Sequence, residues 1–105
     1  MSLIQVFGGS GFVGSAFVEK NPNTIVNFRN DYNVVGTGDI LYMISTVTNY
    51  HVKTDPYIDI DTNLTTLMKV LEQCKDLDLT FNFVSSWFVY GETEMPATEE
   101  SNCYP

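Results

Sequence analysis

Short apolar runs alternate with amphipathic stretches along most of the chain. Apolar and β-branched residues cluster in segments that we expect to form strands. These are Leu3–Phe7, Thr24–Phe28, Asn33–Val35, Ile40–Ile44 and Leu79–Ser85. Between them, apolar residues at helical spacing predict one helix over residues 11–20 and a second over residues 58–74. The buried side of the second helix is expected to consist of Leu64, Leu67, Met68, Leu71 and Cys74.

This order of elements predicts the class of fold. Strands and helices that alternate with short connections are typical of a parallel α/β sheet. We therefore expect an α/β, three-layer, Rossmann-like open parallel sheet of about five strands, in the order 3-2-1-4-5, with helices on both faces. Residues 1–91 are expected to form this domain, and the acidic residues 92–105 a loop or tail. A ligand would bind at the carboxyl ends of the strands, where the order reverses between the first and the fourth.

A glycine-rich segment joins the first expected strand to the first expected helix. Its glycines are Gly8, Gly11 and Gly14. At this spacing the first permits a tight turn, the second lets the backbone approach a pyrophosphate, and the third lets the helix pack against the sheet. The N–H groups of Phe12 and Val13 would face the phosphates at the positive end of the helix dipole. The pattern favours nucleotide binding, and the alternative is an ordinary glycine-rich turn.

The second expected strand ends beside a basic and an acidic residue, Arg29 and Asp31. In dinucleotide-binding folds an acidic residue at this place holds the ribose 2′-OH, whereas an arginine accommodates a 2′-phosphate. Because a planar guanidinium binds a phosphate through two parallel hydrogen bonds, Arg29 favours NADP over NAD. The alternative is a surface ion pair between Arg29 and Asp31.

Several motifs in chain order resemble those of the extended short-chain dehydrogenase/reductase family, the NAD(P)-dependent sugar-nucleotide epimerases, dehydratases and reductases. The glycine spacing is similar to that of the family, and residues 39–46 are similar to its strand that ends in two small residues beside the cofactor. Pro56 and Asn63 match its proline and helix asparagine. Residues 85–91 resemble its Ser-Ser-x-x-Val-Tyr-Gly signature, and Glu99, Glu100 and Pro105 resemble the residues that follow.

The resemblance implies a set of site residues. Cofactor contacts are expected from Gly8, Ser10, Gly11, Phe12, Val13, Gly14, Arg29, Asp39, Ser45 and Thr46. Ser86 matches the family's catalytic serine or threonine, whose hydroxyl helps to polarise a sugar hydroxyl or keto oxygen. The alternative for Ser86 is the cap of a helix or turn.

The chain also departs from the family pattern. The family's Tyr-x-x-x-Lys pair follows the proline that matches Pro105, where this sequence ends, and no tyrosine within it precedes a lysine by four residues. The helix that the family has between the positions of Arg29 and Asp39 is expected to be lost. We therefore expect a cofactor-binding part, followed by the start of a missing substrate and catalytic half, that is not catalytic alone. A non-catalytic nucleotide-binding or interaction module is the alternative.

Charge and composition exclude several other functions. The formal net charge is -8, so nucleic acid and anionic membrane surfaces are poor partners. No apolar stretch is long enough to span a membrane, and two cysteines are too few for a disulfide framework, so we expect a soluble, cytoplasmic protein. The expected last strand would be left as an apolar edge, which predicts a homo-oligomer.

No metal site is expected. Asp59–Asn63 begins like a calcium loop, but Leu64 stands where glycine is needed and Val70 where a bidentate glutamate is needed. His51 is the single histidine and is expected in a solvated loop.

Overall fold

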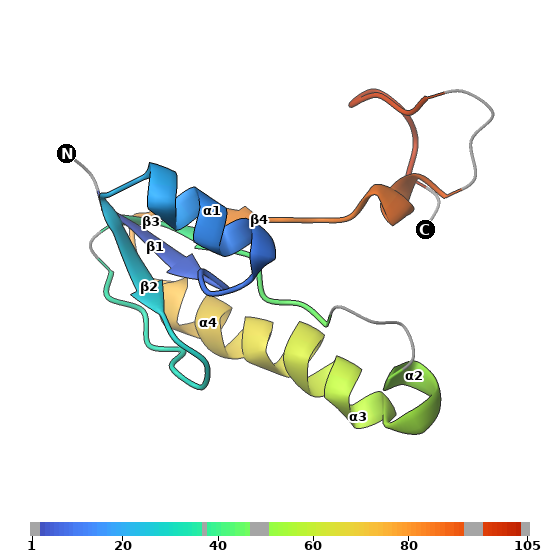
Figure 1. Cartoon of the computed structure of the whole chain (residues 1–105), viewed down its shortest axis with the longest axis horizontal. Helices are drawn as coiled ribbons and strands as arrows, with labels where there is room; N and C mark the ends of the chain where they lie inside the picture. Colours follow the sequence, from blue (N-terminus) through green and yellow to red (C-terminus); the bar gives the residue numbers. More distant parts are fainter. Residues whose placement is uncertain (1–2, 37, 47–50, 92–95, 104–105) are drawn as a thin grey trace.

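A parallel sheet forms the centre of the molecule. The computed structural model of the chain describes residues 3–36, 38–46, 51–91 and 96–103. The strands are β1 (Leu3–Phe7), β2 (Thr24–Asn27), β3 (Gly38–Tyr42) and β4 (Phe81–Phe83), in the order β2-β1-β3-β4 (Figure 1). All three pairings are parallel, and Phe7 stands in register with Asn27 and Tyr42. The carboxyl ends of β1, β2 and β3 therefore meet at one edge of the sheet.

Helices cover both faces of this sheet. Helix α1 (Phe12–Lys20) lies on one face, and α4 (Thr66–Cys74) lies on the other (Figure 1). Before α4 the chain forms α2 (His51–Thr54), α3 (Pro56–Asp59) and the π-helix η1 (Ile60–Thr65), and the 3-10 helix η2 (Trp87–Tyr90) follows β4. The Asp55 carboxylate caps α3 by accepting a hydrogen bond from Tyr57 N at 3.2 Å. The expected three-layer, Rossmann-like fold is confirmed.

One expected strand is not formed. Residues 33–35 belong to no helix or strand, so the described sheet has four strands rather than five. The observed order is the expected order with this third strand removed. The physical reason is that side chains, rather than a neighbouring strand, hold the backbone of this segment, as in the hydrogen bond from Val35 N to Gln5 Oε1. His51, expected in a loop, begins helix α2, while residues 47–50 of that loop lie outside the described part.

The buried side expected for the second helix is confirmed only in part. Leu67 and Cys74 pack against the core as expected. Thr66 and Val70 are buried in α4, whereas Leu64, Met68 and Leu71 are 55%, 54% and 37% exposed. In η1 the hydrogen bonds span five residues instead of four, which changes the phase of the helix faces. An apolar stripe therefore lies on the outside of this helical segment.

The core lies between the sheet and α4. Phe7, Ile40, Tyr42 and Val70 are fully buried there. The ring of Tyr42 packs against three phenylalanines, with centroid distances of 5.6 Å to Phe81, 5.9 Å to Phe7 and 6.1 Å to Phe83. Burial also raises the pKa of the Cys74 thiol at the edge of this core.

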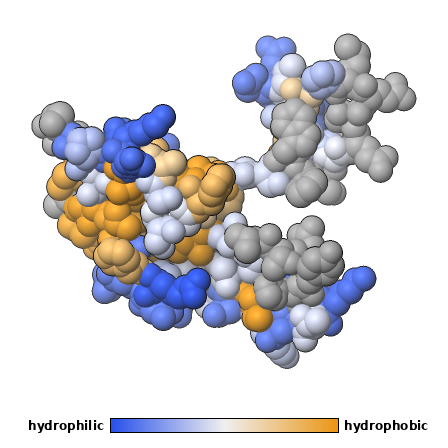
Figure 2. Space-filling model, in the orientation of Figure 1, coloured by the Kyte–Doolittle hydropathy of each residue, from blue (hydrophilic) through white to orange (hydrophobic). Residues whose placement is uncertain are grey.

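The segment beyond β4 extends away from the sheet (Figure 1). The radius of gyration is 15.4 Å, above the value of about 13 Å that a compact chain of this length would have. Residues 96–103 form no helix or strand, and Figure 2 shows this end of the chain standing apart from the apolar surface of the main body. Among the described helices, none has both the length and the apolar character required to cross a membrane.

The Tyr42 hydroxyl is buried without a hydrogen-bond partner among the described residues. Because an unpaired buried hydroxyl costs free energy, Tyr42→Phe should raise the free energy of unfolding by about 1 kcal/mol at neutral pH. Urea denaturation measures this change. Tyr57→Phe is the control, since Tyr57 is 76% exposed and its replacement should change nothing.

The same hydroxyl makes stability depend on alkaline pH. Burial, and secondarily the nearby Tyr32, raise the pKa of Tyr42 from 10.0 to about 12. Between these values the unfolded chain has lost the proton and the folded chain has kept it, so stability falls as pH rises through this window. Tyr42→Phe should remove this part of the loss. Equal pH dependence of the variant and the parent chain would contradict the assignment.

Candidate functional site

A tight glycine turn connects β1 to α1. Gly8 has φ +90°, in the left-handed region that favours glycine, and its carbonyl accepts a hydrogen bond from Gly11 N at 3.1 Å. Gly11 then precedes α1 with an extended backbone, and its own carbonyl accepts from Ser15 N at 2.9 Å. The turn therefore reverses the chain within a few residues and starts the helix directly above the end of β1.

Gly14 lets the helix lie this close to the turn. It is buried, and a Cβ atom added to it would lie 2.1 Å from Gly8 O and 2.8 Å from Gly9 Cα. These are backbone atoms that cannot move without moving β1 or α1. By contrast, a Cβ on Gly11 would meet only Gly8 O, at 3.4 Å. A glycine at position 14 is thus required for α1 to pack against the turn. At position 11 the absence of a side chain leaves open space beside the turn.

The first turn of α1 presents unused backbone donors. The first N–H groups of any helix lack an intrahelical partner, and no side chain caps this helix. No acidic residue stands in its first turn either. The amides of Phe12 and Val13 and the positive end of the helix dipole therefore form a site suited to an anion.

A cavity of about 590 Å³ opens at this point, at the carboxyl ends of β1, β2 and β3. Its volume lies in the range typical of small-molecule sites. Nine of the residues that line it belong to the end of β1, the glycine turn, the start of α1 and the segment that follows β3. They are Phe7, Gly8, Ser10, Gly11, Phe12, Val13, Gly14, Met43 and Ser45. The sheet order reverses between β1 and β3, so the cavity stands at the place expected from the sequence.

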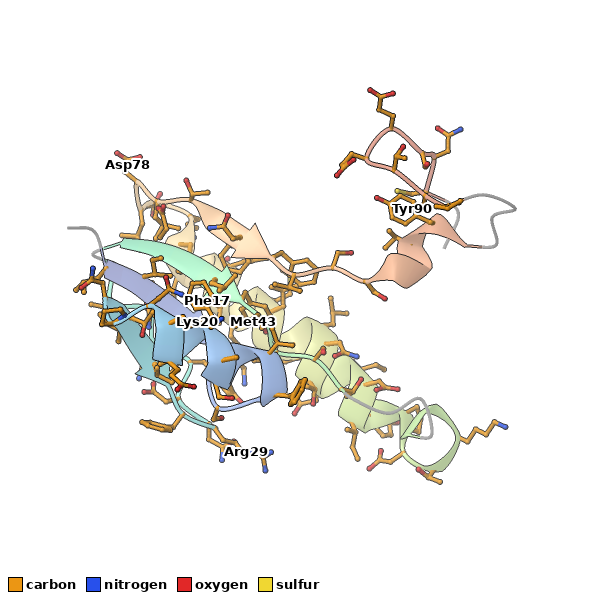
Figure 3. The ribbon with its side chains drawn as sticks, turned by 45° about the horizontal axis from the view of Figure 1, so that its top comes forward. Phe17, Lys20, Arg29, Met43, Asp78 and Tyr90 are labelled. Carbon is orange, nitrogen blue, oxygen red and sulfur yellow. The ribbon has the colours of Figure 1, made fainter. Side chains whose placement is uncertain are left out.

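The opposite wall follows β2. It contains Arg29 and Asp31, which both line the cavity. No ion pair joins the two in the described structure, where the Asp31 carboxylate instead accepts hydrogen bonds from Asn33 N at 3.2 Å and Asn33 Nδ2 at 3.1 Å. Figure 3 shows Arg29 at the tip of the segment that follows β2. The guanidinium is therefore available to a ligand.

Two expected cofactor contacts lie outside the cavity lining. Asp39 stands at the amino-terminal part of β3, where its carboxylate accepts a hydrogen bond from Thr80 N at 2.9 Å and so fixes the start of β4. Thr46 follows Ser45 and is held by Asn63, which accepts from Thr46 N at 2.9 Å and donates to Thr46 Oγ1 at 3.0 Å. Asn63 belongs to η1, so this pair ties the end of β3 to the π-helix.

Ser86, the expected catalytic residue, is also not among the lining residues. It is exposed and stands between β4 and η2, and its carbonyl accepts a hydrogen bond from Val89 N at 3.2 Å. Figure 3 shows Tyr90 in the same segment, apart from Arg29 and Met43. The structure therefore brings together the glycine turn, Arg29 and Ser45, and leaves Ser86 outside this group.

Other lining residues were not among the expected cofactor contacts. They are Asn27, Phe28, Asn30, Asp31, Tyr32, Ile44, Asp61, Thr62 and Thr66. The rule that ligands bind at the carboxyl ends of parallel strands could have indicated Asn27 and Ile44. The approach of Asp61, Thr62 and Thr66 depends on the π-helix, for which the sequence gives no signal. No group of three or more potential metal ligands forms within the described residues.

Among known proteins, the chain matches solved structures. No protein-family model and no curated protein matches the chain. RMD from Pseudomonas aeruginosa, complexed with NADPH, is 20% identical with a TM-score of 0.80, over 100% of this chain and 42% of its own. A UDP-N-acetylglucosamine 4-epimerase from Methanobrevibacter ruminantium M1, in complex with UDP-N-acetylmuramic acid, is 21% identical with a TM-score of 0.77, over 99% of this chain and 44% of its own. A UDP-glucuronic acid 4-epimerase from Bacillus cereus, in complex with UDP-glucuronic acid and NAD, is 20% identical with a TM-score of 0.76. The match covers 97% of this chain and 46% of the epimerase.

The two 4-epimerases among these relatives belong to the class of enzyme that the sequence motifs resemble. At such identities the likeness shows the fold, and the chain spans less than half the length of each relative. The fold is therefore that of a part of UDP-sugar 4-epimerases and of related NAD(P)-binding enzymes.

The packing of Gly14 can be tested by adding one methyl group. Gly14→Ala should lower the free energy of unfolding by about 3 kcal/mol, because its Cβ would overlap the backbone of the glycine turn. Gly11→Ala should stay within about 1 kcal/mol of the parent, since its φ of -76° suits alanine and its Cβ has room. Urea denaturation compares the two. Equal stability of both variants would show that α1 does not pack as described.

Proposed function

We propose that the chain binds a nicotinamide dinucleotide, NAD or NADP, as the cofactor-binding part of a sugar-nucleotide epimerase, dehydratase or reductase. One observation carries this proposal: the glycine turn places the uncapped start of α1 at the mouth of the 590 Å³ cavity, where the sheet order reverses. The relatives support it, since their structures hold NADPH, NAD or UDP-sugars.

The glycine turn would hold the pyrophosphate. The missing side chain of Gly11 lets phosphate oxygens approach the backbone, and the amides of Phe12 and Val13 then donate to them. Ser10 and Ser45 both line the cavity and would supply hydroxyl contacts. Oriented backbone dipoles would stabilise the pyrophosphate here and offset the acidic character of the whole chain, whose formal net charge is -8.

The wall beyond β2 would hold the adenosine end. Arg29 lines the cavity without an ion pair in the described structure, which supports a contact with the 2′-phosphate of NADP. Asp31 lies on the same wall, but its carboxylate is already engaged by Asn33. We therefore favour NADP over NAD.

The chemistry of the bound cofactor would be hydride transfer at the nicotinamide. Within this chain, the Ser86 hydroxyl would orient a sugar hydroxyl or keto oxygen, as the resemblance implies. No tyrosine in the sequence precedes a lysine by four residues. We therefore propose that these residues bind and orient but do not complete proton transfer alone.

A non-catalytic nucleotide-binding module is the second candidate. The position of Ser86 favours it, because this residue stands outside the residues that line the cavity. The two candidates share the same cofactor site and differ in whether a substrate is turned over.

We further propose that the chain assembles with copies of itself and resides in the cytoplasm. The exposed apolar stripe of Leu64, Met68 and Leu71 supports assembly, since contiguous apolar surface commonly marks an interface. The free thiols of Cys74 and Cys103 suit a reducing compartment.

Dinucleotide binding is tested by titrating the chain with NAD(H) and NADP(H) and following the binding by calorimetry. Saturable binding of at least one dinucleotide is expected. Gly11→Ala should weaken it by at least about tenfold while the chain stays folded, because the methyl group occupies the approach of the phosphates. Absence of binding at millimolar concentration, or full affinity in Gly11→Ala, would contradict the proposal.

The preference for NADP is tested by removing one positive charge. Arg29→Ala should weaken NADPH binding by about tenfold and leave NADH binding within about twofold, because only NADPH carries the 2′-phosphate. Lys75→Ala is the matched control, since Lys75 pairs with Glu72 at 2.7 Å on α4 and does not line the cavity. Unchanged NADPH affinity in Arg29→Ala would refute the assignment.

A further inference from the structure

The segment between β2 and β3 is held by side-chain amides instead of by a strand ladder. Gln5, on β1, donates from Nε2 to Asn33 O at 2.7 Å and accepts at Oε1 from Val35 N at 3.0 Å. Two backbone groups that a neighbouring strand would otherwise bind are thereby satisfied. This is why residues 33–35 can cross the sheet without joining it.

Asn27, the last residue of β2, completes this arrangement. Its Oδ1 accepts from Gln5 Nε2 at 2.6 Å, and its Nδ2 donates at 3.1 Å to both Asp31 O and Asn33 O. Gln5 and Asn27 are 4% and 7% exposed. Both N–H bonds of each amide are therefore used, and a buried amide network that is fully satisfied fixes one local conformation.

A third amide approaches the segment from the other side. Gln73, on α4, accepts from Val34 N at 2.9 Å and donates to Tyr32 O at 2.7 Å. The backbone from Asp31 to Val35 is thus held between the sheet and α4. We call Gln5, Asn27 and Gln73 the amide clamp.

The amide clamp reaches the proposed cofactor site through Asn27. Asn27 lines the cavity, and so do all residues from Phe28 to Tyr32. This stretch is a tight turn in which Asp31 N donates to Phe28 O at 3.0 Å and Asn30 has φ 69°. Arg29 is carried by the turn. Its position therefore depends on two anchors, β2 before the turn and the amide clamp after it.

We propose that Gln5 and Asn27 are positioning residues for the adenosine end of the dinucleotide, which they serve by fixing the turn that carries Arg29. This inference rests on the proposed function. It adds two buried residues, Gln5 and Asn27, that are not part of the glycine turn. The clamp takes the place of the strand and helix that would otherwise build this wall. An adenosine nucleotide therefore binds to a wall whose shape is set by buried amides.

The experiment separates the two ends of the site. Asn27→Ala is compared with the parent chain for binding of the preferred dinucleotide, NADH or NADPH, and of inorganic pyrophosphate, which probes the glycine turn alone. Asn27→Ala should lose about tenfold in dinucleotide affinity and stay within about twofold for pyrophosphate. Asn82→Ala is the matched control, because Asn82 also donates its amide to a backbone oxygen, Ile40 O at 3.1 Å, but lies outside the cavity lining.

A second variant covers the possibility that Asn27→Ala does not fold. Gln73 is exposed, so Gln73→Ala releases Tyr32 O and Val34 N without leaving a buried group unpaired. It should accelerate amide hydrogen exchange at Val34 and weaken dinucleotide binding by about threefold, with pyrophosphate affinity unchanged.

Each outcome has a defined meaning. Dinucleotide affinity that is unchanged in both variants overturns the positioning role, and so does an equal loss for dinucleotide and pyrophosphate, which would mean a general structural defect. In both cases the parent chain still binds dinucleotide, so the proposed function stands. A parent chain that binds no dinucleotide overturns the proposed function and this inference together.

Discussion

The close approach of α1 to β1 determines where the helix starts and where the cavity forms. Gly8 turns the chain with a positive φ, and Gly14 lets the helix pack against the carbonyl of that same turn. No larger residue fits at Gly14, so this contact fixes where the helix begins. The start of α1 is thereby aimed at the point where the sheet order reverses, and the cavity forms there. Binding of an anion at this site would follow from backbone geometry and would need no charged side chain.

The second wall of the cavity is built by a different kind of interaction. Where the sequence lacks room for a strand and helix after β2, buried amides of Gln5 and Asn27 bind the backbone of residues 31–35 directly. Such a network is stable only when all its donors and acceptors are paired, as they are here. The site thus combines a rigid glycine turn on one side with an amide-held turn on the other, and Arg29 stands on the second.

Local signals predicted the fold well and the site in part. The first strand was predicted with its observed bounds, and the helix after it began one residue later than expected, because glycines, Asn21 and Pro22 mark these boundaries. Residues 33–35 were predicted as a strand because Val34 and Val35 are β-branched. Their backbone N–H groups instead donate hydrogen bonds to the side chains of Gln5 and Gln73, which are distant in the sequence. A local pattern does not reveal such hydrogen bonds. Leu64 lies in the π-helix, which hydrophobic spacing does not reveal either, and Met68 lies on the exposed side of α4.

We propose that the backbone amides at the start of α1 bind the phosphates of a dinucleotide. Nuclear magnetic resonance of the isotope-labelled chain, titrated with NADPH or NADH, tests it residue by residue. We expect the amide resonances of Gly11, Phe12 and Val13 to shift most, together with those of the turn around Arg29. Saturable binding that leaves the Gly11–Val13 amides unmoved and shifts another surface would contradict it.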